Sequence, residues 1–159
     1  MATPSFVYTT YIATTPEKVW QALVDTKIAA NYWRDPASAS PAHVNVSDWK
    51  PGSTWQHQHL DAAHTVDVVG TVVEVTHPSR LILTWARPQD ADNAAKHSRV
   101  TFDIKPHGDA LVRLTVTHED LETDPKMLES ISGGWPVILS NLKTFLESGH
   151  GLPGVKMSA

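Results

Sequence analysis

Residues 124–149 read DPKMLESISGGWPVILSNLKTFLESG, and this stretch has the apolar periodicity of a helix. Its apolar residues, spaced three and four apart, form one stripe: Leu128, Ile131, Trp135, Ile138, Leu139, Leu142, Phe145 and Leu146. Gly133, Gly134 and Pro136 interrupt the pattern, which fits either a short helix followed by a long one or a single kinked helix. Gly149 occupies the position of a glycine that ends a helix. The stretch predicts a long amphipathic helix that buries one face.

Before this helix, the chain alternates between apolar and polar residues, which is typical of half-buried strands. Short turns separate the later segments, and strands joined so closely pair antiparallel. The segments that we expect to form strands are Ser5–Ala13, Ser53–Leu60, Thr65–Thr76, Leu81–Ala86, Ser98–Lys105 and Ala110–His118. Gly70, inside the third of them, indicates a bulge or a bend.

Two short helices are expected after the first strand. Thr14-Thr15-Pro16-Glu17 offers a threonine cap, a proline in the first turn and an acidic side chain that suits the helix dipole. Asp25 is placed to cap the second of these helices. Arg34–Ala42 holds two prolines among small residues and predicts a loop.

Together these elements predict an α+β fold, in which a curved antiparallel sheet of about seven strands wraps around the long C-terminal helix. The sequence shows no internal repeat and no linker long enough to divide the chain. We therefore expect one domain over residues 1–159, with an ordered core over about residues 5–149.

The composition excludes several classes of protein. A chain with 41% hydrophobic and 19% charged residues is not intrinsically disordered, and a net charge of −4 argues against a nucleic-acid binder. The absence of cysteine excludes disulfides and thiolate metal sites. No apolar run reaches the roughly 18–20 residues of a membrane span, and the N-terminus lacks a signal-peptide pattern. We expect a cytoplasmic protein without membrane insertion.

Tryptophan is unusually frequent, with six residues against three phenylalanines and three tyrosines. Strand and helix parity turns Trp55, Trp85 and Trp135 toward the interface between sheet and helix. There they are either core filler or the walls of an apolar pocket, with indole N–H groups available to a polar ligand tip. Trp33 flanks the predicted loop and either gates the pocket mouth or covers it.

Three histidines are candidates for chemistry. His57 and His59 lie about 7 Å apart on one strand face, a spacing that can chelate a metal, but a third ligand would have to come from His118 or an acid such as Glu74. We therefore assign no metal ligands and expect no cofactor; the alternative is polar histidines near the cavity mouth. His118, at the end of an apolar strand face, is either a general base, a donor that orients a ligand, or a hydrogen-bonded core residue.

Several stretches, taken in order, resemble the SRPBCC superfamily (START-like, birch-pollen-allergen fold), and within it the family related to the activator of heat-shock protein 90 ATPase. They are Ile12–Leu23, Tyr32-Trp33, Arg80–Trp85, Val116–His118, and Gly133–Pro136 together with Leu139 and Leu142-Lys143. The resemblance covers about residues 5–149 and implies a helix-grip fold with a cavity between the sheet and the long helix. The loop over Arg34–Ala42 and the segment His57-Gln58-His59 depart from the family pattern.

These observations lead to one functional hypothesis and two alternatives. We expect the chain to bind a small hydrophobic or amphipathic molecule, with candidate ligand-binding residues Trp33, Trp55, His57, His59, Trp85, His118 and Trp135. The first alternative is an enzyme of the polyketide-cyclase or hydrolase kind that uses a pocket histidine, although no catalytic motif is present. The second, implied by the resemblance, is a chaperone-interaction module, although members with that activity carry an additional domain. A homodimer is a further possible partner state.

Overall fold

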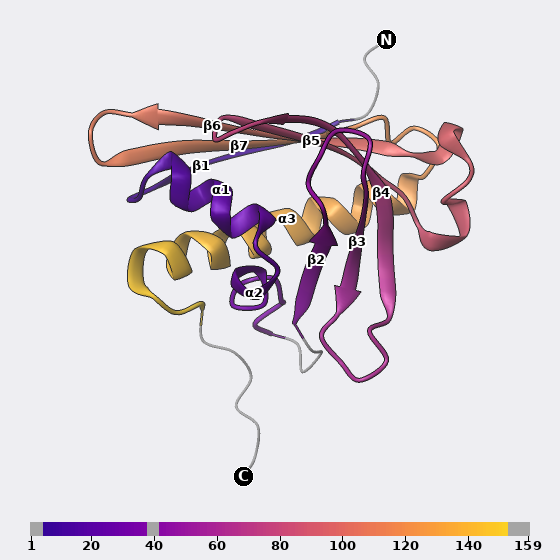
Figure 1. Ribbon diagram of the computed structural model, residues 1–159, viewed down its shortest axis with the longest axis horizontal. Helices are drawn as coiled ribbons and strands as arrows, with labels where there is room; N and C mark the ends of the chain where they lie inside the picture. The colour runs from indigo at the N-terminus through magenta and orange to yellow at the C-terminus, as the bar shows by residue number, and fades with distance from the viewer. Residues whose placement is uncertain (1–4, 38–41, 153–159) are drawn as a thin grey trace.

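The computed structural model describes residues 5–37 and 42–152, and seven strands in this part of the chain form one antiparallel sheet (Figure 1). The strands are β1 (Phe6–Ile12), β2 (His43–Ser47), β3 (Thr54–His59), β4 (Val66–Thr76), β5 (Arg80–Trp85), β6 (Ser98–His107) and β7 (Leu111–Glu119). The helices are α1 (Pro16–Val24), α2 (Thr26–Ala29) and α3 (Pro125–Ser148), with 3-10 turns η1 (Pro88–Asp90) and η2 (Ala94–Lys96). The predicted strand segments are confirmed to within a few residues at each end.

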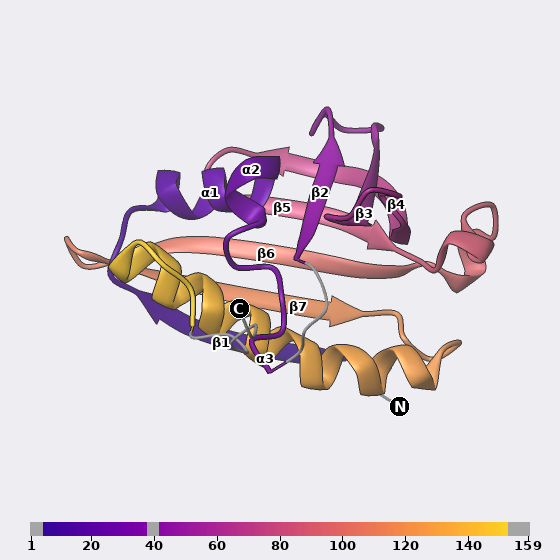
Figure 2. The same ribbon diagram turned by 90° about the horizontal axis from the view of Figure 1, so that it is seen from below.

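The sheet has the strand order β1-β7-β6-β5-β4-β3-β2, so the first two strands of the chain lie at opposite edges. Helices α1 and α2 make the connection between these edges. Figure 1 shows β2, β3 and β4 turning out of the plane of the other strands toward the side on which α3 lies, and Figure 2 shows α3 running along β1 and β7. The predicted helix-grip architecture, a curled antiparallel sheet around a long C-terminal helix, is confirmed.

The two short helices begin as the sequence indicates. Thr15, rather than Thr14, is the cap of α1, and its side chain accepts a hydrogen bond from the backbone N–H of Lys18. Asp25 caps α2 by accepting from the backbone N–H groups of Lys27 and Ile28. These bonds satisfy backbone donors that have no partner within the helix itself.

Helix α3 is continuous over its 24 residues, so neither glycine divides it into two helices. Asp124 caps its start by accepting from the backbone N–H of Met127 at 3.0 Å. Gly149 ends it in a left-handed conformation (φ 87°), which a residue without a side chain adopts most easily. The long unbroken helix presents its whole apolar stripe to the sheet.

Gly70 does not form the predicted bulge, because it pairs regularly with Trp55 of β3. The register instead shifts between His57 and Gln58 where β3 meets β4, and between Val72 and Glu74 where β4 meets β5. A bulge redirects the side chains beside it, and the first of these shifts lies next to the candidate histidines.

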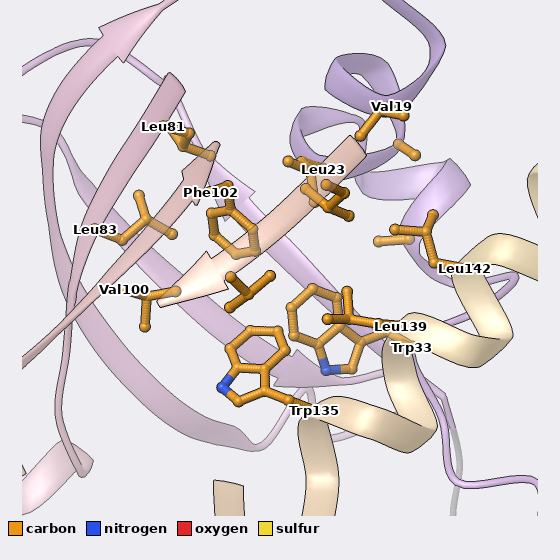
Figure 3. Close-up of a cluster of buried hydrophobic side chains, with 14 of the residues drawn as sticks. Val19, Leu23, Trp33, Leu81, Leu83, Val100, Phe102, Trp135, Leu139 and Leu142 are labelled. Atoms are coloured by element: carbon orange, nitrogen blue, oxygen red, sulfur yellow. The ribbon is translucent and has the colours of Figure 1, made fainter. Parts of the chain in front are cut away.

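The core fills the space between the concave side of the sheet and the helices (Figure 3). Alternate residues of the central strands point inward, and the stripe of α3 meets them together with Val19 and Leu23 of α1. The side chains labelled in Figure 3 from the sheet are Leu81, Leu83, Val100 and Phe102, and those from α3 are Trp135, Leu139 and Leu142. Beyond them, toward β2–β4, the packing gives way to a cavity.

Candidate functional site

A cavity of about 420 Å³ opens between the first half of α3 and strands β2–β5. Its volume lies in the range of small-molecule sites. Apolar and aromatic side chains line its interior, and charged side chains stand at its mouth. The interior residues are Trp33, Val68, Trp85, Met127, Ile131, Trp135 and Ile138; the polar and charged ones are Arg34, Asp35, His43, His57, Asp67, Arg87 and Ser130, and Gly134 completes the lining.

Three tryptophans form a continuous aromatic wall. The ring centroid of Trp135 lies 5.7 Å from that of Trp33 and 5.6 Å from that of Trp85, both in inclined arrangements. Figure 3 shows the Trp33 and Trp135 rings side by side near α3. Such edge-to-face contacts add to the stability of each ring's position. The wall is therefore a fixed apolar surface.

Trp55 lies behind this wall and does not line the cavity. Its ring centroid is 5.3 Å from that of Trp85, and its indole N–H donates to the backbone oxygen of Thr84 at 2.7 Å. The predicted inward orientation of Trp55 is correct, but the residue supports Trp85 rather than facing the cavity.

The indole nitrogen of Trp85 has no hydrogen-bond partner among the described residues. The residue is 7% exposed, so this N–H is withdrawn from bulk water. A buried donor without a partner costs about 1–3 kcal/mol, and most native proteins avoid that cost. No water-sized molecule reaches this nitrogen, so the N–H is enclosed by protein and does not open into the cavity.

His118 is fully buried, and both of its ring nitrogens have protein partners. Nδ1 accepts from the indole N–H of Trp135 at 3.1 Å, and Nε2 lies 2.7 Å from the hydroxyl of Ser98. Burial lowers the pKa of His118 to about 3. His118 does not line the cavity. It fixes the Trp135 ring from the side away from the cavity, so it is a hydrogen-bonded core residue, one of the roles that the sequence allowed.

His57 lines the cavity and is 6% exposed. Its Nδ1 bonds to the side-chain oxygen of Asn45 on β2 at 2.7 Å. Burial, with the neighbouring His43 and His59 adding to it, lowers the pKa of His57 well below its ordinary value. The ring is therefore neutral near pH 7, and its bond to an amide oxygen places the proton on Nδ1.

The structure does not bring His57 and His59 together as the metal-chelating pair that was considered from the sequence and not assigned. The two side chains have different partners: His57 bonds to Asn45, whereas His59 lies 2.7 Å from a carboxylate oxygen of Asp67. Neither suggested third ligand joins them, since His118 is engaged with Trp135 and Ser98, and Glu74 accepts from Thr76. His59 instead belongs to a cluster with His43 and Asp67.

Two residues that position the site were not among the candidate site residues identified from the sequence. Asn141 of α3 is fully buried and donates to the backbone oxygen of Tyr32 at 2.6 Å. The Tyr32 hydroxyl in turn donates to the backbone oxygen of Ala22 at 2.7 Å. These bonds tie the segment that carries Trp33 to α1 and α3, so the aromatic wall depends on buried polar groups away from the cavity.

The family model described as activator of Hsp90 ATPase homolog 1-like protein matches residues 13–147. The chain belongs to this family. The predicted resemblance is confirmed over nearly the same residues, and the fold of this Hsp90-activator-like chain agrees with it. No curated protein matches the chain at a significant level.

Solved structures share the fold of this Hsp90-activator-like chain. A protein from Cytophaga hutchinsonii is 25% identical, with a TM-score of 0.68 over 92% of this chain and 96% of its own. An HSP90 activator from Plasmodium falciparum is 22% identical, with a TM-score of 0.69 and the same coverage. The Aha1 dimer from Colwellia psychrerythraea is 18% identical, with a TM-score of 0.68 over 93% of this chain and 99% of its own. At these identities the likeness concerns the fold.

Within the described residues, no helix of this Hsp90-activator-like chain combines the length and the apolar character that crossing a membrane requires.

Proposed function

We propose that this chain binds a small amphipathic molecule in the cavity between α3 and strands β2–β5. The observation that carries the proposal is the wall of three tryptophans along a cavity of about 420 Å³. An apolar ligand body would cover the rings of Trp33, Trp85 and Trp135.

The charged mouth indicates where the polar end of such a ligand would lie. Arg34 and Arg87 stand at the mouth with Asp35 and Asp67. Arg87 is held by Asp124, whose carboxylate accepts from its Nε at 2.9 Å. A ligand whose apolar body enters first would leave its polar group among these side chains and in contact with water. The cavity thus favours an amphipathic ligand over a purely apolar one.

The test uses anilinonaphthalene sulfonate, a fluorescent dye with an apolar ring system and an anionic group. We expect saturable binding of one dye per chain, with quenching of tryptophan fluorescence. Gly134 lines the cavity, and a Cβ added there meets no atom within 4 Å, so Gly134→Leu extends an apolar side chain into open space. This variant should weaken dye binding at least about tenfold, which corresponds to about 1.4 kcal/mol.

Gly133→Leu is the matched control. Gly133 is the neighbouring residue on the same helix, is exposed, and likewise has open space around an added Cβ. Both substitutions raise helix propensity by about 0.5–1 kcal/mol, so they differ only in whether they enter the cavity. Absence of saturable dye binding to the unmodified protein would overturn the proposal. Equal weakening by the two variants would place the dye elsewhere and would also contradict it.

The enzymatic alternative loses its strongest candidate, because neither nitrogen of His118 is available to a substrate. The chaperone-interaction alternative rests on the family and on the named Plasmodium relative. No feature of the site favours either alternative over ligand binding.

A further inference from the structure

Three metal-ligating side chains converge beside the mouth of the cavity. His43 comes from β2, His59 from β3 and Asp67 from β4. The Nε2 atoms of His43 and His59 lie 2.9 Å and 2.7 Å from the same carboxylate oxygen, Oδ2 of Asp67. The three ligand atoms all lie within 4.8 Å of one another.

Two features of the strand pairing bring these residues together. His43 and His59 are direct partners in the pairing of β2 with β3, so their side chains stand on the same face. Across the next pair, His57 is opposite Val68 and Gln58 is opposite Val66, which leaves Asp67 as the extra residue of β4. An extra residue in a ladder redirects its side chain, and here the carboxylate meets the two imidazoles.

We propose that His43, His59 and Asp67 bind a divalent transition-metal ion of the zinc class. Two imidazole nitrogens and one carboxylate oxygen form a ligand set that Zn²⁺ accepts, and three protein ligands leave a coordination position open. Without a metal, both Nε2 atoms must carry a proton to share one oxygen. On metal binding each neutral ring moves its proton from Nε2 to Nδ1 by exchange with water, so that both Nε2 atoms and the carboxylate oxygen bond to the cation.

Metal binding requires side-chain adjustments. Tetrahedral zinc with bonds of about 2.0–2.1 Å places its ligand atoms about 3.3 Å apart. The carboxylate oxygen must therefore move away from the two nitrogens, which lie 2.9 Å and 2.7 Å from it, and the nitrogens, which lie within 4.8 Å of each other, must take up the same separation. The Asp67 side chain is 44% exposed and can swing outward. The imidazoles are held more firmly, since the His43 ring stacks on that of His57 with centroids 4.5 Å apart and planes 2° apart.

The cluster adjoins the cavity, where a fourth ligand could reach the ion. His43 and Asp67 both line the cavity, together with His57. Water or another donor at the cavity mouth would complete the coordination shell. Metal binding itself requires no occupant of the cavity, so it is measurable whether or not the proposed ligand binds.

The test titrates the chelator-treated full chain with Zn²⁺ by calorimetry and with Co²⁺ by visible absorption, both near neutral pH. We expect one ion per chain and a Co²⁺ absorption band characteristic of low coordination number. His59→Ala and Asp67→Asn should each weaken Zn²⁺ binding more than about 100-fold, since even residues that only support metal ligands are worth 10–100-fold. His107→Ala is the control, because His107 is exposed at the far hairpin against Tyr11.

Further readouts separate loss of ligation from loss of folding. Asp67→Asn keeps the size of the side chain and an acceptor oxygen, and its circular dichroism should match that of the unmodified protein. Imidazole nitrogen resonances should shift on Zn²⁺ addition for His43 and His59. No binding at about 0.1 mM Zn²⁺, equal binding by His59→Ala, or shifts confined to other histidines would each overturn the proposal.

Discussion

The indole N–H of Trp135 donates to Nδ1 of His118 at 3.1 Å, and this bond fixes the state of the histidine. An indole nitrogen only donates, so Nδ1 must be unprotonated and the neutral ring carries its proton on Nε2. Nε2–H then donates to Ser98, whose hydroxyl donates to the backbone oxygen of Trp85. This chain of bonds joins two tryptophans of the cavity wall through a core that excludes water.

The first prediction concerns the pH dependence of stability. Burial lowers the pKa of His118 to about 3 in the folded state, whereas an unfolded histidine titrates near 6.5. Below about pH 6.5 the unfolded chain therefore binds a proton that the folded protein excludes. The stabilisation from the buried neutral His118 is fully present above about pH 6.5 and decreases as the pH is lowered from 6.5 to about 3. From pH 7 to pH 5 we expect the free energy of unfolding to fall by about 2 kcal/mol from this residue.

His118→Gln isolates that contribution. The variant lacks the titrating ring, so its free energy of unfolding, measured in urea at several pH values, should fall less steeply below pH 6.5. His57, the other histidine whose pKa burial lowers, is present in both proteins and cancels in the comparison. Parallel curves for the two proteins would show that His118 is protonated in the folded state, contrary to this assignment.

The second prediction concerns Gly70, where three strands approach one another closely. A Cβ on Gly70 would lie 1.9 Å from the backbone oxygen of Thr84 and 2.5 Å from Nε1 of Trp55. Those two atoms form the hydrogen bond that crosses over β4 to join β3 with β5. We expect Gly70→Ala to lower the free energy of unfolding by more than about 3 kcal/mol, because backbone must move or the bond must break. Gly133→Ala, with open space around its Cβ, should instead stabilise by about 1 kcal/mol in the same denaturation assay.

The sequence predicted six of the seven strands because their residues alternate or are rich in β-branched and aromatic types. It missed β2, whose inward positions include His43 and Asn45 rather than aliphatic residues. A strand with a polar inner face has no hydrophobic alternation to detect. Strand β2 supplies His43 to the metal-ligating cluster and Asn45 as the partner of His57. Because the strand was not predicted, neither residue was among the candidate site residues.

Parity correctly turned Trp55, Trp85 and His118 inward, but parity cannot distinguish the first layer of a cavity from the layer behind it. That distinction depends on which ring lies between the cavity and the next ring. Helix α3 places Trp135 between the cavity and His118. The meeting of Asp67 with His43 and His59 was also beyond prediction from one strand. Register is a property of two paired strands. The shift that makes Asp67 an extra residue of β4 therefore cannot be recognised from the sequence pattern of β3 or of β4 alone.

The third prediction concerns Asn141 as the anchor of Trp33. Its amide donates to the backbone oxygen of Tyr32, and its side-chain oxygen accepts from the backbone N–H of Leu152 at 2.6 Å. Asn141→Leu fills the site but leaves both backbone groups unpaired, which costs about 1–3 kcal/mol for each buried group. We expect a loss of about 2–4 kcal/mol in urea denaturation. A loss no larger than that for Ser140→Ala, at a neighbouring half-buried position, would contradict the assigned role.

The fourth prediction separates the two functions of Asp124. Oδ1 of Asp124 caps α3 by accepting from the N–H of Met127, and Arg87 at the cavity mouth donates from Nε to Oδ2 at 2.9 Å and from Nη2 to Oδ1 at 3.4 Å. The bond from Arg87 is the main cause that lowers the pKa of Asp124, and the cap adds to it. This contribution to stability is therefore present above the carboxyl's unfolded pKa and is lost as the pH falls through the folded one. Asp124→Ala removes cap and ion pair and should cost about 1–2 kcal/mol, whereas Asp124→Asn keeps a capping oxygen and should cost less than about 1 kcal/mol. Thermal denaturation at neutral pH measures both variants, and equal losses would mean that the cap contributes nothing to the stability of the helix.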